Sequence, residues 1–263
     1  MPPALSLITL LTDFGTKDYF VGSMKGVILM INPDARIIDI SHDITPHRIA
    51  EAAYCLQACY RTFPEGTVHV AVVDPGVGSA RRPILVKTSR YYFVAPDNGV
   101  LTAVLNQEQD IEVRQLENQR YQLDSPGATF QGRDVFAPAA AWLAKGEAPS
   151  SFGRPVSDPV RLNWPEPKFE EGRILGEVVS VDRFGNLITN LTRHQIKAIT
   201  TGTAQIRVGP HVVKTIVENY SEGTADIPHA LINSNGMLEF FIREKSASDM
   251  LQVGIGTAVQ LNW

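Results

Sequence analysis

The chain has 263 residues, 24 basic and 28 acidic side chains, a formal charge of −4 and a hydrophobic content of 44%. This length predicts one large or two modest domains with enough chain for a hydrophobic core, without disulfides or metals. The slight acidity argues against a nucleic-acid-binding protein, and no apolar run approaches the roughly 20 residues of a membrane-spanning helix.

Strands and helices alternate through the N-terminal half of the sequence. Apolar runs bounded by polar turns predict strands over residues 5–11, 35–40, 68–73, 84–87 and 91–95. Helical spacing predicts helices over residues 19–31, 48–62 and 137–145, and a short helix that ends near residue 105. Nearly unbroken Val, Ile and Leu strands between helices are typical of a parallel sheet that is buried on both faces.

Three aspartates stand at the ends of predicted strands, namely Asp13, Asp43 and Asp74. Open parallel sheets bind their ligands beyond the carboxyl ends of the strands. We therefore expect a polar site at that edge of the sheet.

The composition changes between Pro149 and Gly172, where prolines are frequent and no period is sustained, as in an interdomain linker. Short strands follow, predicted over residues 173–182, 203–208, 212–216, 237–242 and 258–261, with one helical stretch around 246–251. We predict an α/β fold class, with an N-terminal parallel-sheet α/β domain over residues 1–165 and a smaller C-terminal antiparallel β-barrel domain over residues 173–263.

Cys55 and Cys59 stand four residues apart in a helical pattern. This spacing suits a disulfide poorly, and no further cysteine or adjacent histidine completes a zinc site. The N-terminal segment MPPALSLITLLTDFG lacks the positive charge of a signal peptide. We expect two buried thiols in a cytoplasmic protein.

The densest motif is VVDPGVGSARR, over residues 72–82. Its two glycines permit close backbone approach, and Arg81 can fold back onto Asp74 as an ion pair. A structural turn with a surface arginine is the alternative. A phosphate cradle is disfavoured, because the segment lacks both the G-x-G-x-x-G pattern and a Walker lysine.

Two further motifs combine glycine with polar side chains. In GATFQGRDVFAP, over residues 127–138, Asp134 can cap the following helix or pair with Arg133. In SVDRFGNLITN, over residues 180–190, Asn186 offers a donor and an acceptor to a heterocycle edge, although an ordinary hairpin also fits.

Seven segments, in this order, resemble the S-adenosyl-L-methionine hydroxide adenosyltransferase family, formerly DUF62. They are TDFG (12–15), DISHDI (39–44), FPEGTVHVAVVDPGVGSAR (63–81), PDNG (96–99), TFQGRD (129–134), DRFGNLITN (182–190) and NSNGMLEF (233–240). The resemblance implies hydrolysis of S-adenosyl-L-methionine to adenosine and L-methionine, with no cofactor and no metal. It also implies a homotrimer with sites between the N-terminal domain of one subunit and the C-terminal domain of the next, and neither a nucleic-acid nor a membrane partner.

The resemblance implies that Asp74 and Arg81 surround the attacking water, where Arg81 stabilises the developing hydroxide and Asp74 orients Arg81 and contacts the nucleoside. Gln131 stands where hydrolases of the family carry a histidine. Glutamine hydrogen-bonds a water but takes no proton near neutral pH. Activity survives if that histidine only positions water, and it falls about 10²- to 10⁴-fold if the histidine relays a proton.

The resemblance also implies substrate contacts. Asp13 would accept hydrogen bonds from the ribose 2′- and 3′-hydroxyls, and Asp182 would receive the methionine ammonium. Asn186 would contact the adenine edge, with Phe184 as a stacking neighbour.

Further contacts are implied for Ser234 and Glu239, in the last motif. His42 and His47 lie near strand ends, but the family needs no metal, so we do not expect them to be metal ligands.

Three activities remain to be compared. A hydrolase is favoured over a halide transferase, because Asp74 and Arg81 are both present and a carboxylate repels a halide. A protein that binds adenosine or S-adenosyl-L-methionine without turnover is the other alternative, and Gln131 is the residue that favours it.

Overall fold

The computed structural model describes residues 6–197 and 205–263. The chain divides into two compact units, Met1–Trp164 and Pro165–Trp263. Each unit has its own hydrophobic core and is described by itself.

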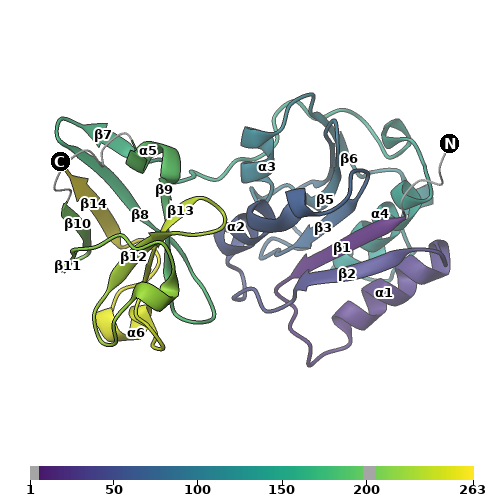
Figure 1. Cartoon of the computed structure of the whole chain (residues 1–263). Coiled ribbons are helices and arrows are strands. Elements are labelled where there is room, and N and C mark those ends of the chain that lie inside the picture. The colour runs from purple at the N-terminus through teal and green to yellow at the C-terminus, as the bar shows by residue number, and fades with distance from the viewer. Residues whose placement is uncertain (1–5, 198–204) are drawn as a thin grey trace. The chain divides into compact units, whose positions relative to one another are not determined.

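The first unit contains a six-stranded sheet in the order β2-β1-β3-β5-β4-β6 (Figure 1). Its strands are β1 (Leu7–Thr12), β2 (Arg36–Ser41), β3 (Val68–Val72), β4 (Pro83–Lys87), β5 (Tyr92–Pro96) and β6 (Glu112–Gln115). The first four strands of that order pair in parallel, as predicted, whereas β4 runs antiparallel to both of its neighbours, β5 and β6. The short connection between β4 and β5 explains this difference, because a tight turn can join only antiparallel strands. The sequence pattern did not predict β6.

Helices cover both faces of this sheet (Figure 1). They are α1 (Phe20–Ile31), α2 (Ile49–Cys59), α3 (Thr102–Gln107) and α4 (Ala137–Ala144). Short 3₁₀ turns cover Tyr60–Thr62, Gln119–Tyr121 and Pro149–Ser151, and a turn of π-helix over Gly132–Phe136 leads into α4. Side chains of α1 and α4 share one core with the sheet, and those of α2 and α3 share the other.

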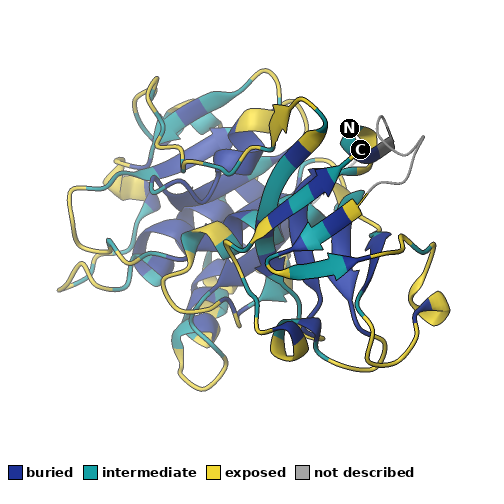
Figure 2. Ribbon diagram, turned by 90° about the vertical axis from the view of Figure 1, so that its left-hand side faces the viewer, coloured by how far each residue is buried: buried dark blue, intermediate teal, exposed yellow. Residues whose placement is uncertain are grey.

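Burial follows this arrangement (Figure 2). Every residue of β1 and β3 is buried, as expected for central parallel strands. The edge strand β2 differs, since it has no fully buried residue and its Ile38 is 44% exposed.

The proline-rich stretch predicted as a linker is partly folded onto the first unit. Phe152 is buried in its core, and the Phe152 carbonyl accepts hydrogen bonds from the amides of Glu117 and Asn118. The boundary between the two units lies further along the chain, between Trp164 and Pro165.

The second unit is an antiparallel, barrel-like sheet of eight strands. They are β7 (Lys168–Glu170), β8 (Arg173–Val181), β9 (Leu187–Thr192), β10 (Gln205–Val208), β11 (His211–Val213), β12 (His229–Ile232), β13 (Met237–Phe241) and β14 (Ala258–Asn262). Short helices are α5 (Arg193–Lys197), α6 (Ala247–Leu251) and a 3₁₀ turn over Tyr220–Glu222. The sequence pattern missed β7, which lies in the predicted linker, and also β9 and β12. Residues 203 and 204 of one predicted strand lie outside the described residues.

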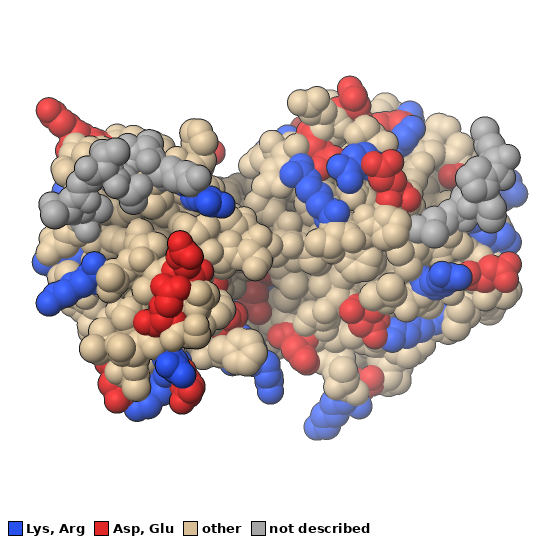
Figure 3. Space-filling view, in the orientation of Figure 1, with Lys and Arg blue, Asp and Glu red and all other residues tan. Residues whose placement is uncertain are grey.

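Acidic and basic side chains are interspersed on the face drawn in Figure 3. Across the described residues, no helix combines the length and apolar character that crossing a membrane requires.

Candidate active site

Asp74 and Arg81 meet at the carboxyl end of β3. The turn after the strand is closed by backbone hydrogen bonds from Val77 to Asp74 and from Ser79 to Gly76, which brings Arg81 back to the strand end. Arg81 Nε donates to Asp74 Oδ1 at 3.0 Å, and Nη2 donates to Oδ2. Their side chains are only 9% and 5% exposed, so this is a buried bidentate pair and not a surface arginine.

Gln131 completes a three-residue cluster, here called the Arg81 cluster (Asp74, Arg81 and Gln131). Gln131 immediately precedes the π-helical turn, and its Oε1 accepts a hydrogen bond from Arg81 Nη2 at 2.6 Å. The guanidinium lies 5.5 Å from the centre of the Phe136 ring. The structure thus brings together all three residues for which a catalytic role was expected.

The Arg81 cluster retains two donors. Arg81 Nη1 is buried and, within the part of the chain that the structure describes, it has no hydrogen-bond partner. Because the oxygen of Gln131 faces a guanidinium donor, its NH₂ group points elsewhere and can donate. The groups that remain open in the cluster are therefore donors, which suit an electron-rich oxygen.

A cavity of about 110 Å³ adjoins the cluster. Its lining consists of Phe14, Phe20, Val72, Asp74, Val77, Thr129, Phe130, Gln131 and Gly132. The ring centres of Phe20 and Phe130 are 5.1 Å apart, so aromatic carbon forms much of the wall. Gly132 permits this packing, since a Cβ there would lie 3.2 Å from both Phe14 and Phe130. An apolar wall with a polar end is the usual form of a small-molecule site.

Asp13 lies at the same edge of the sheet. Thr12 of β1 pairs with Val72 of β3, so Asp13 and Asp74 follow neighbouring parallel strands. Asp13 is partly buried, and its Oδ2 accepts a hydrogen bond from the His47 amide at 2.9 Å. Asp43, which follows β2, is exposed.

Asp134 pairs with Arg133 and does not cap the helix. Arg133 Nε donates to Asp134 Oδ1 at 2.6 Å, and no side chain caps the following helix. The pairing alternative is thus the correct one.

The second unit holds its own pocket of about 660 Å³. Asp182, Phe184 and Asn186 all line it. Asp182 accepts hydrogen bonds from the backbone amides of Phe184 and Asn186, and from the Asn186 side chain at 3.0 Å. Phe184 is 76% exposed, although it lines the pocket.

Glu239 and Ser234 do not line this pocket. Glu239 is 3% exposed, and it accepts hydrogen bonds from the Tyr220 hydroxyl at 2.6 Å and from Asn233 at 3.1 Å. Burial raises the pKa of Glu239, although the hydrogen bonds from Tyr220 and Asn233 oppose this effect. Ser234 is exposed in the turn between β12 and β13.

Sequence reasoning missed several lining residues. Tyr220 joins Glu239 to the pocket, and Phe241, Arg243 and Ser246 line it as well. No motif marks Tyr220, whereas Phe241 directly follows the segment NSNGMLEF and Arg243 lies two residues beyond Phe241.

Cys55 and Cys59 are free thiols and only partly buried. Burial raises the pKa of Cys55 to about 11 and that of Cys59 to about 12, so both are protonated near neutral pH. Residues 6–197 and 205–263 contain no group of three or more His, Cys, Asp or Glu side chains that could hold a metal ion.

Two family models match the chain. The SAM hydroxide adenosyltransferase N-terminal domain matches residues 8–153, and the C-terminal domain of the same family matches residues 176–260. The chain belongs to the SAM hydroxide adenosyltransferase family.

Relatives similar to this chain include proteins named as hydrolases and as a fluorinase. A Methanocaldococcus jannaschii protein named (R)-S-adenosyl-L-methionine hydrolase is 38% identical, covering 95% of this chain and 93% of the relative. A Thermus thermophilus protein of the same name is 36% identical over 95% of this chain and 97% of its own length. An Actinoplanes sp. protein named fluorinase is 31% identical, over 88% and 89% of the two chains.

A solved structure agrees with the fold. An uncharacterised conserved protein from Thermotoga maritima superposes with a TM-score of 0.92 at 35% identity, covering 97% of this chain and 100% of that chain.

Proposed function

We propose that this chain hydrolyses S-adenosyl-L-methionine to adenosine and L-methionine. The Arg81 cluster carries the proposal, because one buried guanidinium binds both Asp74 and Gln131, which line an aromatic cavity, and keeps one nitrogen without a partner among the described residues. The relatives named (R)-S-adenosyl-L-methionine hydrolase, which align with nearly the whole chain, support it.

The reaction is a displacement at ribose C5′. A hydroxide-like oxygen forms the new C5′–O bond while the C5′–S bond breaks. The electron pair of the C5′–S bond stays on sulfur, which neutralises the sulfonium as methionine leaves. A neutral thioether leaves without a general acid, so the protein has to hold the nucleophile in line with the leaving sulfur. A dry aromatic pocket strengthens the attraction between hydroxide and sulfonium.

Within this proposal, Arg81 Nη1 and the Gln131 NH₂ group donate to the attacking oxygen. Both oxygens of Asp74 already accept from Arg81, and an amide takes no proton. The proton of the attacking water therefore goes to solvent, and Gln131 acts as a positioner of the nucleophile.

Substrate binding divides between the two units. We propose that Asp13 accepts hydrogen bonds from the ribose hydroxyls, Asp182 receives the methionine ammonium, and Asn186 and Phe184 contact adenine. Ser234 is proposed as a further contact, and Glu239 is proposed to act through Tyr220.

The proposal includes a homotrimer in which each site takes groups from two subunits, and it includes no cofactor. A cytoplasmic location is also part of it, since a reducing compartment preserves free thiols such as Cys55 and Cys59. A variant that stays monomeric and folded yet hydrolyses the substrate would contradict the shared site.

The direct test is chromatography of products from S-adenosyl-L-methionine, with and without chloride. We expect adenosine and methionine in equal amounts in both buffers. Asp74→Asn should abolish them, because it removes the charge that orients Arg81, while Asp43→Asn, at the exposed end of β2, should not. A 5′-chloro nucleoside that forms only with chloride would instead indicate halide transfer.

A non-catalytic binding protein is the second candidate, and Gln131 favours it. Such a protein would leave S-adenosyl-L-methionine intact and show only a ligand-induced rise in melting temperature. Product formed by Gln131→His but not by the wild type would support that alternative.

A further inference from the structure

A series of polar side chains adjoins Asp13 and has no part in the proposed displacement. It begins in the core at Thr12 and His42 and ends at the surface at Asp39 and Lys25. The hydroxyl of Thr12, the last residue of β1, lies 2.8 Å from His42 Nδ1. His42 Nε2 lies 3.1 Å from Asp39 Oδ1, within ion-pair distance but outside hydrogen-bond geometry, and Lys25 donates to Asp39 Oδ2 at 2.6 Å. Thr12 is fully buried and His42 is 6% exposed.

This series fixes the backbone on both sides of Asp13. The Phe14 amide donates to the Thr12 hydroxyl at 3.2 Å, and the Gly15 amide donates to the His42 carbonyl at 2.8 Å. The Thr12 hydroxyl therefore bonds the Phe14 amide and the His42 imidazole at the same time, one as acceptor and the other in the direction that the His42 tautomer sets. His42 therefore holds the chain on both sides of Asp13, through its ring at Thr12 and through its carbonyl at Gly15.

The segment after His42 also holds the Asp13 carboxylate. His47, whose amide donates to Asp13 Oδ2, has φ = 70°, a left-handed conformation that residues other than glycine seldom adopt. Such a conformation persists where the surrounding structure enforces it. An ionised carboxylate held at one oxygen keeps acceptor sites for further donors.

We infer that Thr12 and His42 are positioning residues that orient Asp13 toward the ribose 2′- and 3′-hydroxyls, and that they set the selectivity for nucleosides that carry these hydroxyls. The inference rests on the proposed function, in which Asp13 binds the ribose. Two neighbouring hydroxyls are bound together only if the carboxylate is held in the right orientation, since hydrogen bonds weaken steeply when misaligned.

Calorimetric binding of adenosine and of 2′,3′-dideoxyadenosine to the full-length protein tests this inference. Thr12→Val and His42→Ala should each weaken adenosine binding about tenfold, the value of one well-formed hydrogen bond, while dideoxyadenosine binding stays within about twofold. Thr12→Ser keeps the hydroxyl and should keep most of the selectivity.

A matched control exists on the same strand. The Thr9 hydroxyl lies 2.8 Å from His69 Nδ1, and both residues are fully buried. Thr9→Val therefore removes an equivalent core contact away from Asp13. It should lower the melting temperature and leave the ratio of the two affinities unchanged.

A double-mutant cycle separates positioning from general stability. In an Asp13→Ala background, Thr12→Val should no longer change the affinity ratio, because the group that it positions is gone. If the ratio of the adenosine and dideoxyadenosine affinities is unchanged in both Thr12→Val and His42→Ala, because both nucleosides lose affinity equally or not at all, this inference is overturned and the proposed function is not. Wild-type protein that binds neither adenosine nor S-adenosyl-L-methionine would overturn the proposed function and the inference together.

Discussion

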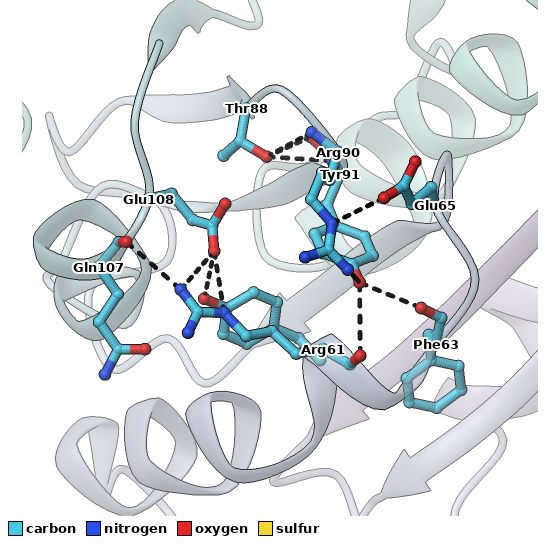
Figure 4. A network of polar contacts seen from close by, with 9 residues as sticks. Arg61, Phe63, Glu65, Thr88, Arg90, Tyr91, Gln107 and Glu108 are labelled. Carbon is cyan, nitrogen blue, oxygen red and sulfur yellow. Dashed lines mark hydrogen bonds and ion pairs between the residues drawn. The ribbon is translucent and has the colours of Figure 1, made fainter.

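The two ends of the first sheet use the same residue types in different ways. At the amino ends of β3 and β5, Arg61 and Tyr60 both donate to Glu108, and Arg90 pairs with Glu65 (Figure 4). Burial alone would raise the pKa of Glu108, but the hydrogen bonds from Tyr60 and Arg61 lower it below its usual value.

At the carboxyl end, the Arg81 cluster pairs an arginine with a carboxylate just as closely, yet keeps a buried donor without a partner. Among the described residues, a buried nitrogen without a partner does not separate the two ends, since His69 Nε2 at the amino end is another. The difference is the aromatic cavity beside the cluster. The comparison teaches that an arginine–carboxylate pair by itself indicates structure, whereas a pair whose carboxylate and neighbouring amide line a cavity indicates a candidate site.

The largest expected effect comes from a matched pair of arginine substitutions. Arg81→Lys keeps the charge beside Asp74, but one ammonium cannot replace the planar set of donors, so we expect kcat to fall about 10²- to 10³-fold. Arg61→Lys, at the other end of the sheet, should leave kcat unchanged and cost about 1 kcal/mol of stability. Steady-state kinetics and thermal unfolding of both variants check this contrast, and equal kinetic losses would contradict it.

His69 gives the amino end a pH dependence of stability. Burial lowers the pKa of His69 to about 3, whereas a histidine in the unfolded chain titrates near 6.5. Below about pH 6.5 the unfolded state therefore binds a proton that the folded state does not, and stability falls as the pH falls. At pH 4.5, two units below the unfolded value, the loss is about 3 kcal/mol, because each pH unit contributes on the order of 1.4 kcal/mol.

Denaturant unfolding of wild type and His69→Gln between pH 4.5 and pH 7.5 measures this contribution. Below about pH 6.5 the free energy of unfolding of the variant should fall less steeply with decreasing pH than that of the wild type, since glutamine does not titrate. Parallel pH curves for the two proteins would show that His69 contributes nothing.

Gln131 has a smaller expected effect on the reaction. Gln131→Leu removes one donor to the nucleophile, and we expect kcat to fall about tenfold. The pH profile of kcat/KM should show no inflection near pH 6.5 in the wild type, and Gln131→His should introduce one. An inflection of that kind already present in the wild type would contradict the role given to Gln131.

The smallest effect is expected for Tyr60→Phe, which removes only the 2.7 Å hydrogen bond to Glu108. We expect about 1 kcal/mol of lost stability and unchanged kinetics. A kinetic defect in this variant would show that the amino end also serves the reaction.

Sequence could predict what is local or repeated along the chain. The pairing of Arg81 with Asp74 spans seven residues and one turn, and the position of Asp13 follows from the end of a buried strand. The antiparallel orientation of β4 was missed, because the apolar patterns of buried strands do not report their direction, and β6 was not predicted at all.

The sequence also could not predict contacts between segments that are far apart along the chain. Tyr220 is joined to Glu239 across 19 residues, and Thr12 to His42 across 30. Neither pair has a spacing that a periodic pattern reveals. The partners are brought together by strand pairing and loop packing, which depend on the whole fold.

The central claim is that the Arg81 cluster directs a water-derived oxygen to ribose C5′. Reaction in ¹⁸O-labelled water, followed by mass spectrometry of the products, tests it most directly. The account predicts one ¹⁸O atom in the 5′-hydroxyl of adenosine and none in methionine. Unlabelled adenosine, or label in an amino-acid product, would contradict it.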